Sequence, residues 1–354
     1  MKTLNLQQHK RMYRFIIFFI FVLISCKKEH LKEDETKVYS ELEFYFKEND
    51  YNTCMVISSL EITNNNVIII SAFKRIDHNF NYAAVFTFNN NKISEVDSAD
   101  FLSLDQSLKK LKGINDEQFW YNENLLIKYD KNQEQLVYSW SVAGFNNILK
   151  SSKFKLDKFD NLWEATNDGI NEFDGQNWKN YFKGNRFWAI CLDSQKNLYA
   201  STMPGFDEPG IILKYNYEKW DTLAICSANA KWVPCMHFDS EDNLWFGVLS
   251  RWAVAPESGD GLYKYDGKNF TNYNIYNSKL PSNSIIDIAI DKHNNKWIGM
   301  YSSGLAKLNN NNELKIFNKN NTPMPFESIE HIVVDNNNNT WMAIQFYGLA
   351  KLKE

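Results

Sequence analysis

The sequence is poor in histidine, which is a common metal ligand and acid–base catalyst. It holds 6 histidines in 354 residues, and no two of them have a spacing typical of metal ligands. It also lacks a glycine-rich phosphate loop, a nucleophile-elbow serine and a paired-carboxylate motif. These absences predict a chain without a metal or a cofactor, and they argue against a catalytic role.

Acidic residues slightly outnumber basic ones, 43 against 39. The formal net charge is -4, and residues 1–25 contain Lys2, Lys10, Arg11 and Arg14 but no acidic residue. Without that segment the charge becomes -4 minus 4, or -8. This balance argues against nucleic acid or an anionic lipid surface as a partner.

The N-terminal apolar run, residues 15–24, is shorter than the roughly 20 residues that a membrane-spanning helix needs. It follows a basic region and ends just before Ser25 and Cys26, which is the pattern of a secretory signal. Leu-Ile-Ser-Cys resembles the bacterial lipobox, which implies a palmitoylated Cys26 as the first mature residue and an outer-membrane lipid anchor, on the periplasmic or cell-surface side. An uncleaved membrane anchor is the alternative. We expect residues 1–25 to be the signal peptide, residues 26–37 a charged tether and residues 38–354 one domain.

An aspartate recurs six residues before an aromatic residue. The intervals between successive aspartates are 36, 46, 52 and 44 residues, which is the length of a four-stranded propeller blade. A glycine followed by an apolar residue returns downstream in every unit. Short β-branched and aromatic runs bounded by Asn, Asp, Gly and Pro predict strands rather than helices. The pairs are Asp157–Trp163, Asp193–Tyr199, Asp239–Trp245, Asp291–Trp297 and Asp335–Trp341.

The stretches NSKLPSNSIIDIAIDKHNNKWIGMYSSGLAKL and GDGLYKYDGKNFTNY resemble the two-component regulator propeller repeat. The resemblance covers about residues 151–352 and implies an all-β, β-propeller fold. Members of that family often form the periplasmic sensor of hybrid histidine kinases. Because the 354 residues include no kinase, we expect this chain to pass any signal to another protein.

Two more blades are expected within residues 38–147, which gives seven blades, with six as the alternative. One comes from apolar runs separated by Asn turns, and the other is centred on Asp130 and Leu136. Residues 105–119 form either a short helix or an irregular strand. Residues 38–46 make a strand without a unit of its own, and we expect it to pair with the last unit and close the ring.

Most repeated residues have a structural explanation. We expect the tryptophans to form the core between blades, the aspartates to make Asx turns rather than calcium sites, and the glycines to adopt positive φ or allow close approach. Cys226 and Cys235 flank a loop, and they are either a disulfide or buried free thiols.

The binding surface is expected where the repeat is extended. The distances from the aromatic residue to the glycine are 6, 11, 16, 7 and 7 residues, so two neighbouring blades carry long b-to-c loops on the face that they share with the d-to-a loops. An arginine beside exposed aromatic residues can hold a carboxylate and stack on sugar or peptide. The alternative is that the insertions only cap their blades. The predicted binding residues are Arg186, Trp188, Phe206, Asp207, Glu208, Trp232, Arg251, Trp252 and Glu257.

These features favour a monomeric, non-catalytic module that binds a glycan, a peptide or a partner protein. The alternative is a propeller enzyme of the lyase or glycan-cleaving type that acts at the central channel.

Overall fold

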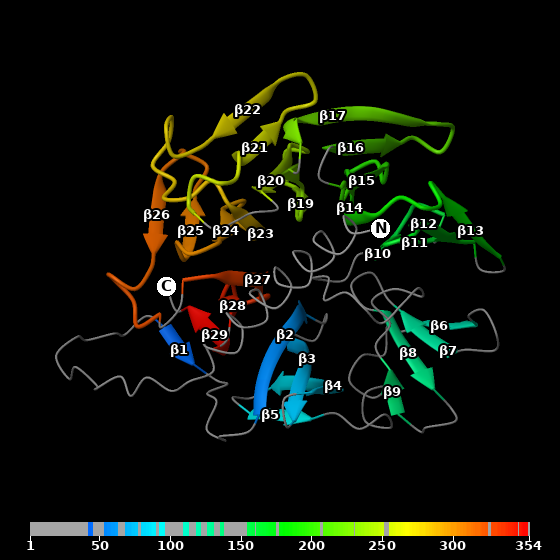
Figure 1. Ribbon diagram of the computed structural model, residues 1–354, viewed down its shortest axis with the longest axis horizontal. Helices are drawn as coiled ribbons and strands as arrows, with labels where there is room; N and C mark the ends of the chain where they lie inside the picture. The colour runs from blue at the N-terminus through cyan, green and yellow to red at the C-terminus, as the bar shows by residue number, and fades with distance from the viewer. Residues whose placement is uncertain are drawn as a thin grey trace, which may run out of the picture. The chain divides into compact units, whose positions relative to one another are not determined.

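The computed structural model describes strands within residues 42–137 and also describes residues 154–352, with gaps at residues 160, 175–176, 206–207, 230, 251–254, 325–326 and 346. Residues 39–354 form one compact unit. In the described part of the chain, every regular element is a β-strand (Figure 1). No helix in that part has the length and apolarity needed to cross a membrane.

The described strands fall into seven sheets, which we number 1 to 7 in chain order. Sheet 1 contains β2 (Thr53–Ile62), β3 (Ile68–Ile76), β4 (Asn79–Asn89) and β5 (Lys92–Glu95). Sheet 2 contains β6 (Lys109–Lys112), β7 (Gln118–Tyr121), β8 (Leu126–Asp130) and β9 (Gln135–Val137). Sheet 3 contains β10 (Phe154–Leu156), β11 (Leu162–Thr166), β12 (Gly169–Phe173) and β13 (Trp178–Tyr181).

Sheet 4 contains β14 (Phe187–Leu192), β15 (Leu198–Thr202), β16 (Pro209–Tyr215) and β17 (Trp220–Asn229). Sheet 5 contains β18 (Lys231–Trp232), β19 (Met236–Phe238), β20 (Leu244–Ser250), β21 (Gly261–Tyr265) and β22 (Phe270–Tyr273). Sheet 6 contains β23 (Ile285–Ile290), β24 (Lys296–Met300), β25 (Leu305–Leu308) and β26 (Leu314–Phe317). Sheet 7 contains β27 (Ile329–Val334), β28 (Thr340–Ile344), β29 (Gly348–Leu352) and β1 (Leu42–Phe44).

Neighbouring strands in all seven sheets are antiparallel. They follow chain order except in sheet 5, where β18 and β19 both pair with β20, and in sheet 7, where β1 pairs with β29. Leu42 lies opposite Leu352 and Phe44 lies opposite Ala350, so the strand predicted within residues 38–46 pairs with the last unit (Figure 1). The all-β arrangement of four-stranded antiparallel sheets is that of a β-propeller, as the repeat predicted.

The second sheet differs from its sequence reading in one respect. Residues 105–119, left open between helix and strand, contribute β6 and the start of β7. Asp130 ends β8, which is the third strand of sheet 2, whereas Asp157 follows the first strand of sheet 3. The prediction that Asp130 matches the repeated aspartate is therefore wrong. The strands that contain Asp130 and Leu136 do lie in one sheet.

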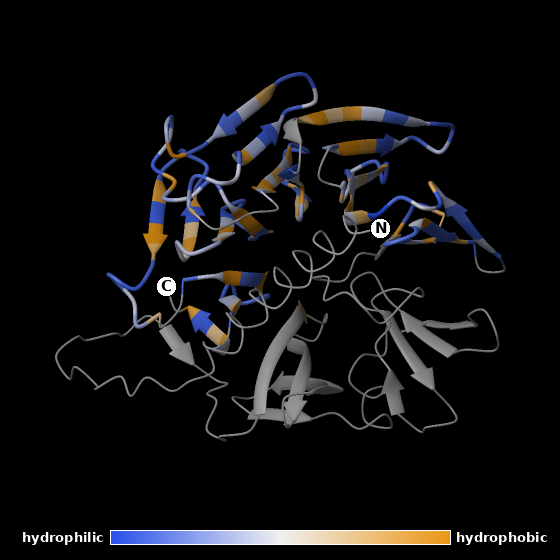
Figure 2. Cartoon of the chain, viewed as in Figure 1, coloured by the Kyte–Doolittle hydropathy of each residue, from blue (hydrophilic) through white to orange (hydrophobic). Residues whose placement is uncertain are grey.

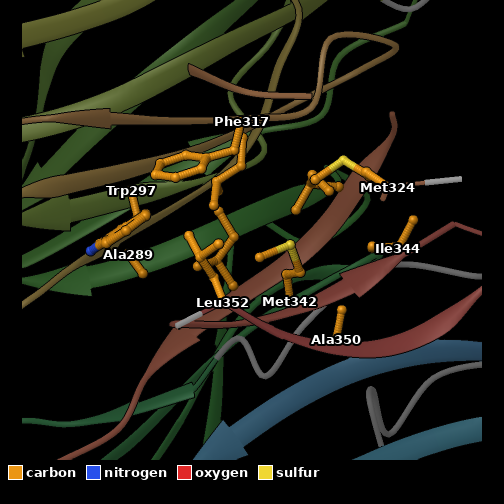
Figure 3. Close-up of a cluster of buried hydrophobic side chains, with 11 residues drawn as sticks. Ala289, Trp297, Phe317, Met324, Met342, Ile344, Ala350 and Leu352 are labelled. Carbon is orange, nitrogen blue, oxygen red and sulfur yellow. The ribbon is translucent and has the colours of Figure 1, made fainter. Parts of the chain in front are cut away.

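The core lies between successive sheets, as predicted for the repeated tryptophans. Trp297 on β24 and Phe317 on β26 stack at 5.9 Å and pack with Met342 and Leu352 of sheet 7 (Figure 3). Trp163, Trp245 and Trp341 are buried in the same way. The outermost strand of sheet 3, β13, has no fully buried residue and is largely hydrophilic (Figure 2).

The Gly-apolar step marks the start of the third strand. Gly304 has φ +78° there, and a β-carbon would lie 2.2 Å from the Phe317 carbonyl oxygen, so both conformation and space require glycine. Gly210 has no positive φ, but its β-carbon would lie 2.5 Å from the Lys231 carbonyl oxygen. Both parts of the expectation for these glycines are confirmed.

Successive turns after the first strand are joined by hydrogen bonds. The Ser194 backbone N–H donates to Asp242 of the next sheet at 2.8 Å, and the Ser240 N–H donates to Asn294 at 3.1 Å. Asp242 and Asn294 have φ values of 64° and 62°, a left-handed conformation that Asp and Asn tolerate better than other side chains. Each of these contacts therefore links the turn of one sheet to the turn of the following one.

Candidate functional site

The repeated aspartates are used inside their own turns. One carboxylate oxygen of Asp291 accepts the backbone N–H groups of His293 and Asn295 at 2.9 and 2.8 Å, and the other accepts the Trp297 indole N–H at 3.1 Å. Burial raises the pKa of Asp291, but hydrogen bonds from Asn295, Trp297 and His293 outweigh it and leave the pKa below its usual value. These are Asx turns, as predicted, and no group of three metal-ligating side chains occurs among the described residues.

The two long connections lie where the sequence predicted them. Residues 203–208 join β15 to β16 and residues 251–260 join β20 to β21, whereas the equivalent connections in sheets 3, 6 and 7 are shorter. They are therefore the extended second-to-third-strand loops of sheets 4 and 5.

Strand β18 holds both connections. The Trp232 indole N–H donates to the Pro204 carbonyl oxygen at 3.3 Å, at the base of the first loop. Lys231 donates to the Ser258 carbonyl oxygen at 2.6 Å and pairs with Asp260 at 3.0 Å, at the end of the second loop. One short strand thus fixes the bases of both insertions.

The second loop is also fixed to the following sheet. The Asn283 backbone N–H, just before β23, donates to the Pro256 carbonyl oxygen at 2.6 Å, and the Ser282 hydroxyl donates to the same oxygen at 3.1 Å. Gly259 fits closely against this segment, since a β-carbon would lie 2.0 Å from the Asn283 carbonyl oxygen. The segment just before β23 therefore holds the base of the loop formed by residues 251–260.

The predicted binding residues differ in their exposure to solvent, and four of them are not described by the structure. Phe206, Asp207, Arg251 and Trp252 lie outside the described residues. Glu208 and Glu257 are exposed on the two loops, and Arg186 and Trp232 are half-buried.

Trp188 departs from the expectation of an exposed aromatic residue. It is 5% exposed and lies within β14, at the point where the pairing with β15 shifts register between Phe187 and Ala189. Its ring centroid lies 5.1 Å from that of Trp232. A bulge redirects a side chain, and here it turns Trp188 against β18 rather than toward solvent. Trp232 is likewise a strand residue rather than a loop residue.

Arg186 and Trp232 occupy the same position of successive units, seven residues before Asp193 and Asp239. The same position in the next two units is Ser284 and Ser328, both fully buried. The hydrogen bonding agrees with this alignment, because the backbone N–H groups of Met203, Tyr301 and Gln345 donate to the carbonyl oxygens of Arg186, Ser284 and Ser328 at 2.7, 2.9 and 3.0 Å. Extending the repeat alignment seven residues upstream of the aspartate would have revealed this from sequence.

The inner strands carry few polar groups of chemical interest. His331 on β27 is buried, with Nδ1 3.9 Å from the Asp287 carboxylate, which accepts the Ile332 backbone N–H at 2.9 Å. His237 lies on β19. Cys226 and Cys235 do not form a disulfide, and of the two thiols Cys235 is buried whereas Cys226 is half-buried.

No family model matches the chain, and no curated protein matches it. Solved structures do. The extracellular domain of a putative hybrid two-component system of B. thetaiotaomicron superposes with a TM-score of 0.57 at 16% identity, over 85% of this chain and 39% of that one. A streptogramin B lyase gives a TM-score of 0.57 at 12% identity, over 90% of this chain and 99% of that one.

PorZ, a surface component of the type-IX secretion system of Porphyromonas gingivalis, gives a TM-score of 0.54 at 14% identity, over 84% of this chain and 46% of that one. This chain spans less than half the length of PorZ and of the hybrid two-component protein. Several neighbours are thus extracellular propeller domains of hybrid two-component proteins, which match the family that the repeat resembles. At these identities the likeness establishes the fold.

Proposed function

We propose that this protein is a non-catalytic, ligand-binding propeller of the cell envelope. One observation carries the proposal: two adjacent sheets bear the long connections, and both connections are fixed to the intervening strand β18 through Trp232 and Lys231. Loops held at their bases by a rigid β-scaffold are a common way to build a recognition surface. The ligand is a glycan, a peptide or a partner protein.

The proposal includes a ring of seven blades in which β1 completes the last one. The support is the pairing of β1 with β29, which gives sheet 7 the fourth strand that its own unit lacks. Closure of this kind covers the edge of β29, which would otherwise be unpaired. We propose a monomer on the same reasoning.

Attachment of the protein to the outer membrane through an acylated Cys26 also belongs to the proposal. It is supported by the signal-like residues 1–25 and by the charged segment after them. The bacterial propellers that share the fold include extracellular domains and a surface component, which is compatible with an envelope address.

The function is tested by presenting the purified full-length protein to glycan and peptide arrays. Changing Arg251 and Trp252 together to Ala should abolish capture while the melting temperature stays within a few degrees. Phe159 supplies the matched control, because it is a 62% exposed aromatic residue on the turn after β10, at the other end of the strands. Phe159→Ala should capture as the unchanged protein does. Capture by the double variant, or a large loss of its stability, would show that the loops only cap their blades.

An enzyme of the lyase or glycan-cleaving type is the second candidate. The specific observation in its favour is the buried His331 beside Asp287 on neighbouring inner strands, a pairing used in acid–base chemistry. We propose no catalysis because Asp287 already accepts a backbone hydrogen bond there. If the protein cleaves an array ligand and His331→Gln stops the cleavage, the protein is an enzyme and the proposal of a non-catalytic binding protein is wrong.

A further inference from the structure

Two large side chains replace small, buried ones at one position of the repeat. Units 6 and 7 have Ser284 and Ser328 there, whereas units 4 and 5 have Arg186 and Trp232. These departures fall on adjacent sheets, and they flank the same loop that Trp232 holds at Pro204. Resting on the proposed function, we propose that Arg186 and Trp232 form the anchor of the ligand site, and that the ligand is a peptide bearing a free carboxylate beside an apolar side chain.

The charge of Arg186 is not used within the described part of the chain. No hydrogen bond or ion pair of its guanidinium group is formed with any described residue, although the side chain is half-buried. Other cations at this end of the sheets are engaged: Lys231 with Asp260 at 3.0 Å, and Lys319 with Glu327 at 2.9 Å. An anionic ligand could therefore pair with Arg186 without displacing any partner among the described residues.

The backbone of Arg186 is fixed, which favours binding. Its carbonyl oxygen accepts the Met203 N–H at 2.7 Å, and the next residue, Phe187, begins β14. A planar guanidinium presents two parallel N–H donors to a carboxylate, and partial burial strengthens such a pair relative to one in water. A carboxylate is thus the group that this residue type holds best.

The tryptophan two residues after Arg186 and the tryptophan at the matching position of the next unit favour a peptide over a sugar. Trp188 is buried against Trp232, so of the two rings only the half-buried Trp232 retains a substantial surface. The Trp232 N–H and the Lys231 ammonium group are already bound within the protein. A sugar needs polar partners for its hydroxyl groups, whereas an apolar side chain next to a carboxylate needs only the indole surface and the guanidinium group.

The inference is tested with small probes and full-length protein, by ligand-observed NMR and calorimetry. The probes are N-acetyl-alanyl-leucine with a free carboxylate, the same dipeptide as its amide, glucuronate and inorganic phosphate. We expect the free acid to bind and the amide to bind at least roughly tenfold more weakly. Arg186→Gln should abolish this difference in affinity. Arg186→Lys should restore only part of the affinity, because an ammonium group loses the bidentate geometry.

Lys183→Gln is the matched control, because Lys183 is an exposed cation in the same connection. It should bind the free acid as the unchanged protein does. Equal binding of acid and amide, or full binding by Arg186→Gln, overturns the inference. Stronger binding of glucuronate or phosphate than of the dipeptide acid assigns the site to an acidic glycan or a phosphate group and overturns the peptide.

The outcomes also separate this inference from the function on which it rests. If no probe binds while array capture still depends on Arg251 and Trp252, the loop face binds a ligand and the carboxylate anchor is wrong. If neither probes nor arrays reveal binding, the proposed function fails with it. Melting curves of Arg186→Gln and Arg186→Lys check that both variants are folded.

Discussion

Lys296 of sheet 6 forms a buried ion pair with Asp239 of sheet 5, with 3.2 Å between the ammonium nitrogen and the carboxylate oxygen. The two side chains are 5% and 1% exposed. The same carboxylate oxygen accepts the Trp245 indole N–H at 2.8 Å, and the Lys296 ammonium group lies 4.9 Å from the centre of that ring. The other four units of the aspartate–aromatic repeat place Leu162, Leu198, Leu244 or Thr340 at the position of Lys296, so among these five units only one has a charge there.

We expect Lys296→Met to lower the free energy of unfolding by about 3 kcal/mol, because it leaves a buried carboxylate without its counter-ion. The double variant with Asp239→Asn should lose less than the sum of the two single variants. Urea denaturation of the four proteins measures this coupling. Strictly additive effects would show that the pair contributes nothing to the junction.

The Lys296–Asp239 pair also gives a pH dependence. Burial raises the pKa of Asp239, but hydrogen bonds from Trp245 and Asn243 and the charge of Lys296 outweigh it and lower the pKa below its usual value. A lowered carboxylate pKa contributes stability above the unfolded value near 3.9 that is lost as the pH falls through the folded value. Lys296→Met should therefore lose stability less steeply on acidification than the unchanged protein. Parallel acid titrations of the two proteins, followed by circular dichroism, test this.

The contribution of Glu164 to stability is expected to change with pH in the opposite direction, and at higher pH. Glu164 is 3% exposed on β11, and burial raises its pKa to about 8, an effect that a hydrogen bond from Asn171 only partly offsets. Because the folded state holds a proton that the unfolded state releases near pH 4.5, this group's contribution to stability falls as the pH rises from about 4.5 to about 8. Glu164→Gln should flatten the melting temperature over that range and raise it at pH 9. Glu218→Gln, at an exposed position, is the control and should not.

Membrane attachment is expected to depend on Cys26. Cys26→Ser removes the thiol that would be acylated, so the mature chain should move from the membrane fraction to the soluble fraction. Cell fractionation followed by immunoblotting measures this. Retention of the serine variant in the membrane would favour the uncleaved anchor.

The pairing of β1 predicts that the N-terminal segment stabilises the whole unit. A chain that begins at Asn49 lacks β1 and leaves the edge of β29 unpaired. It should lose cooperative unfolding, with a broader transition in thermal and urea denaturation. Melting identical to that of the full-length protein would rule out closure by this strand.

The fold was largely predictable because a repeat multiplies weak signals. The Asp–Trp spacing reports a real contact, since Trp297 donates to Asp291 six residues earlier and Trp163 donates to Asp157 in the same way at 2.8 Å. Sheet 2 was misaligned because its Asp130 has the same spacing to Leu136 without the same place in the sheet. The spacing between two residues does not tell which strand of a sheet contains them.

The candidate site was less predictable, for a reason that Trp188 illustrates. Alternation along a strand gives the direction of a side chain only while the register is regular, and Trp188 lies at a bulge. A second signal was overlooked in the third strands, where a lysine lies over the repeated ring. The Lys307 ammonium group is 4.8 Å from the centre of Trp297, and that of Lys351 is 5.0 Å from the centre of Trp341. Such contacts follow from the cross-strand register, which the periodicity of one strand does not contain.

The hydrogen bonds between successive turns give the array a direction. The later unit supplies the acceptor, Asp242 or Asn294, and the earlier unit supplies the donor, Ser194 or Ser240. The unit of sheet 5 carries both groups, because Asp242 is the acceptor for the preceding unit and Ser240 is the donor for the following one. Duplication of that whole unit would lengthen the array without requiring any new kind of contact. A breakpoint inside a turn would instead separate the donor of that turn from its acceptor.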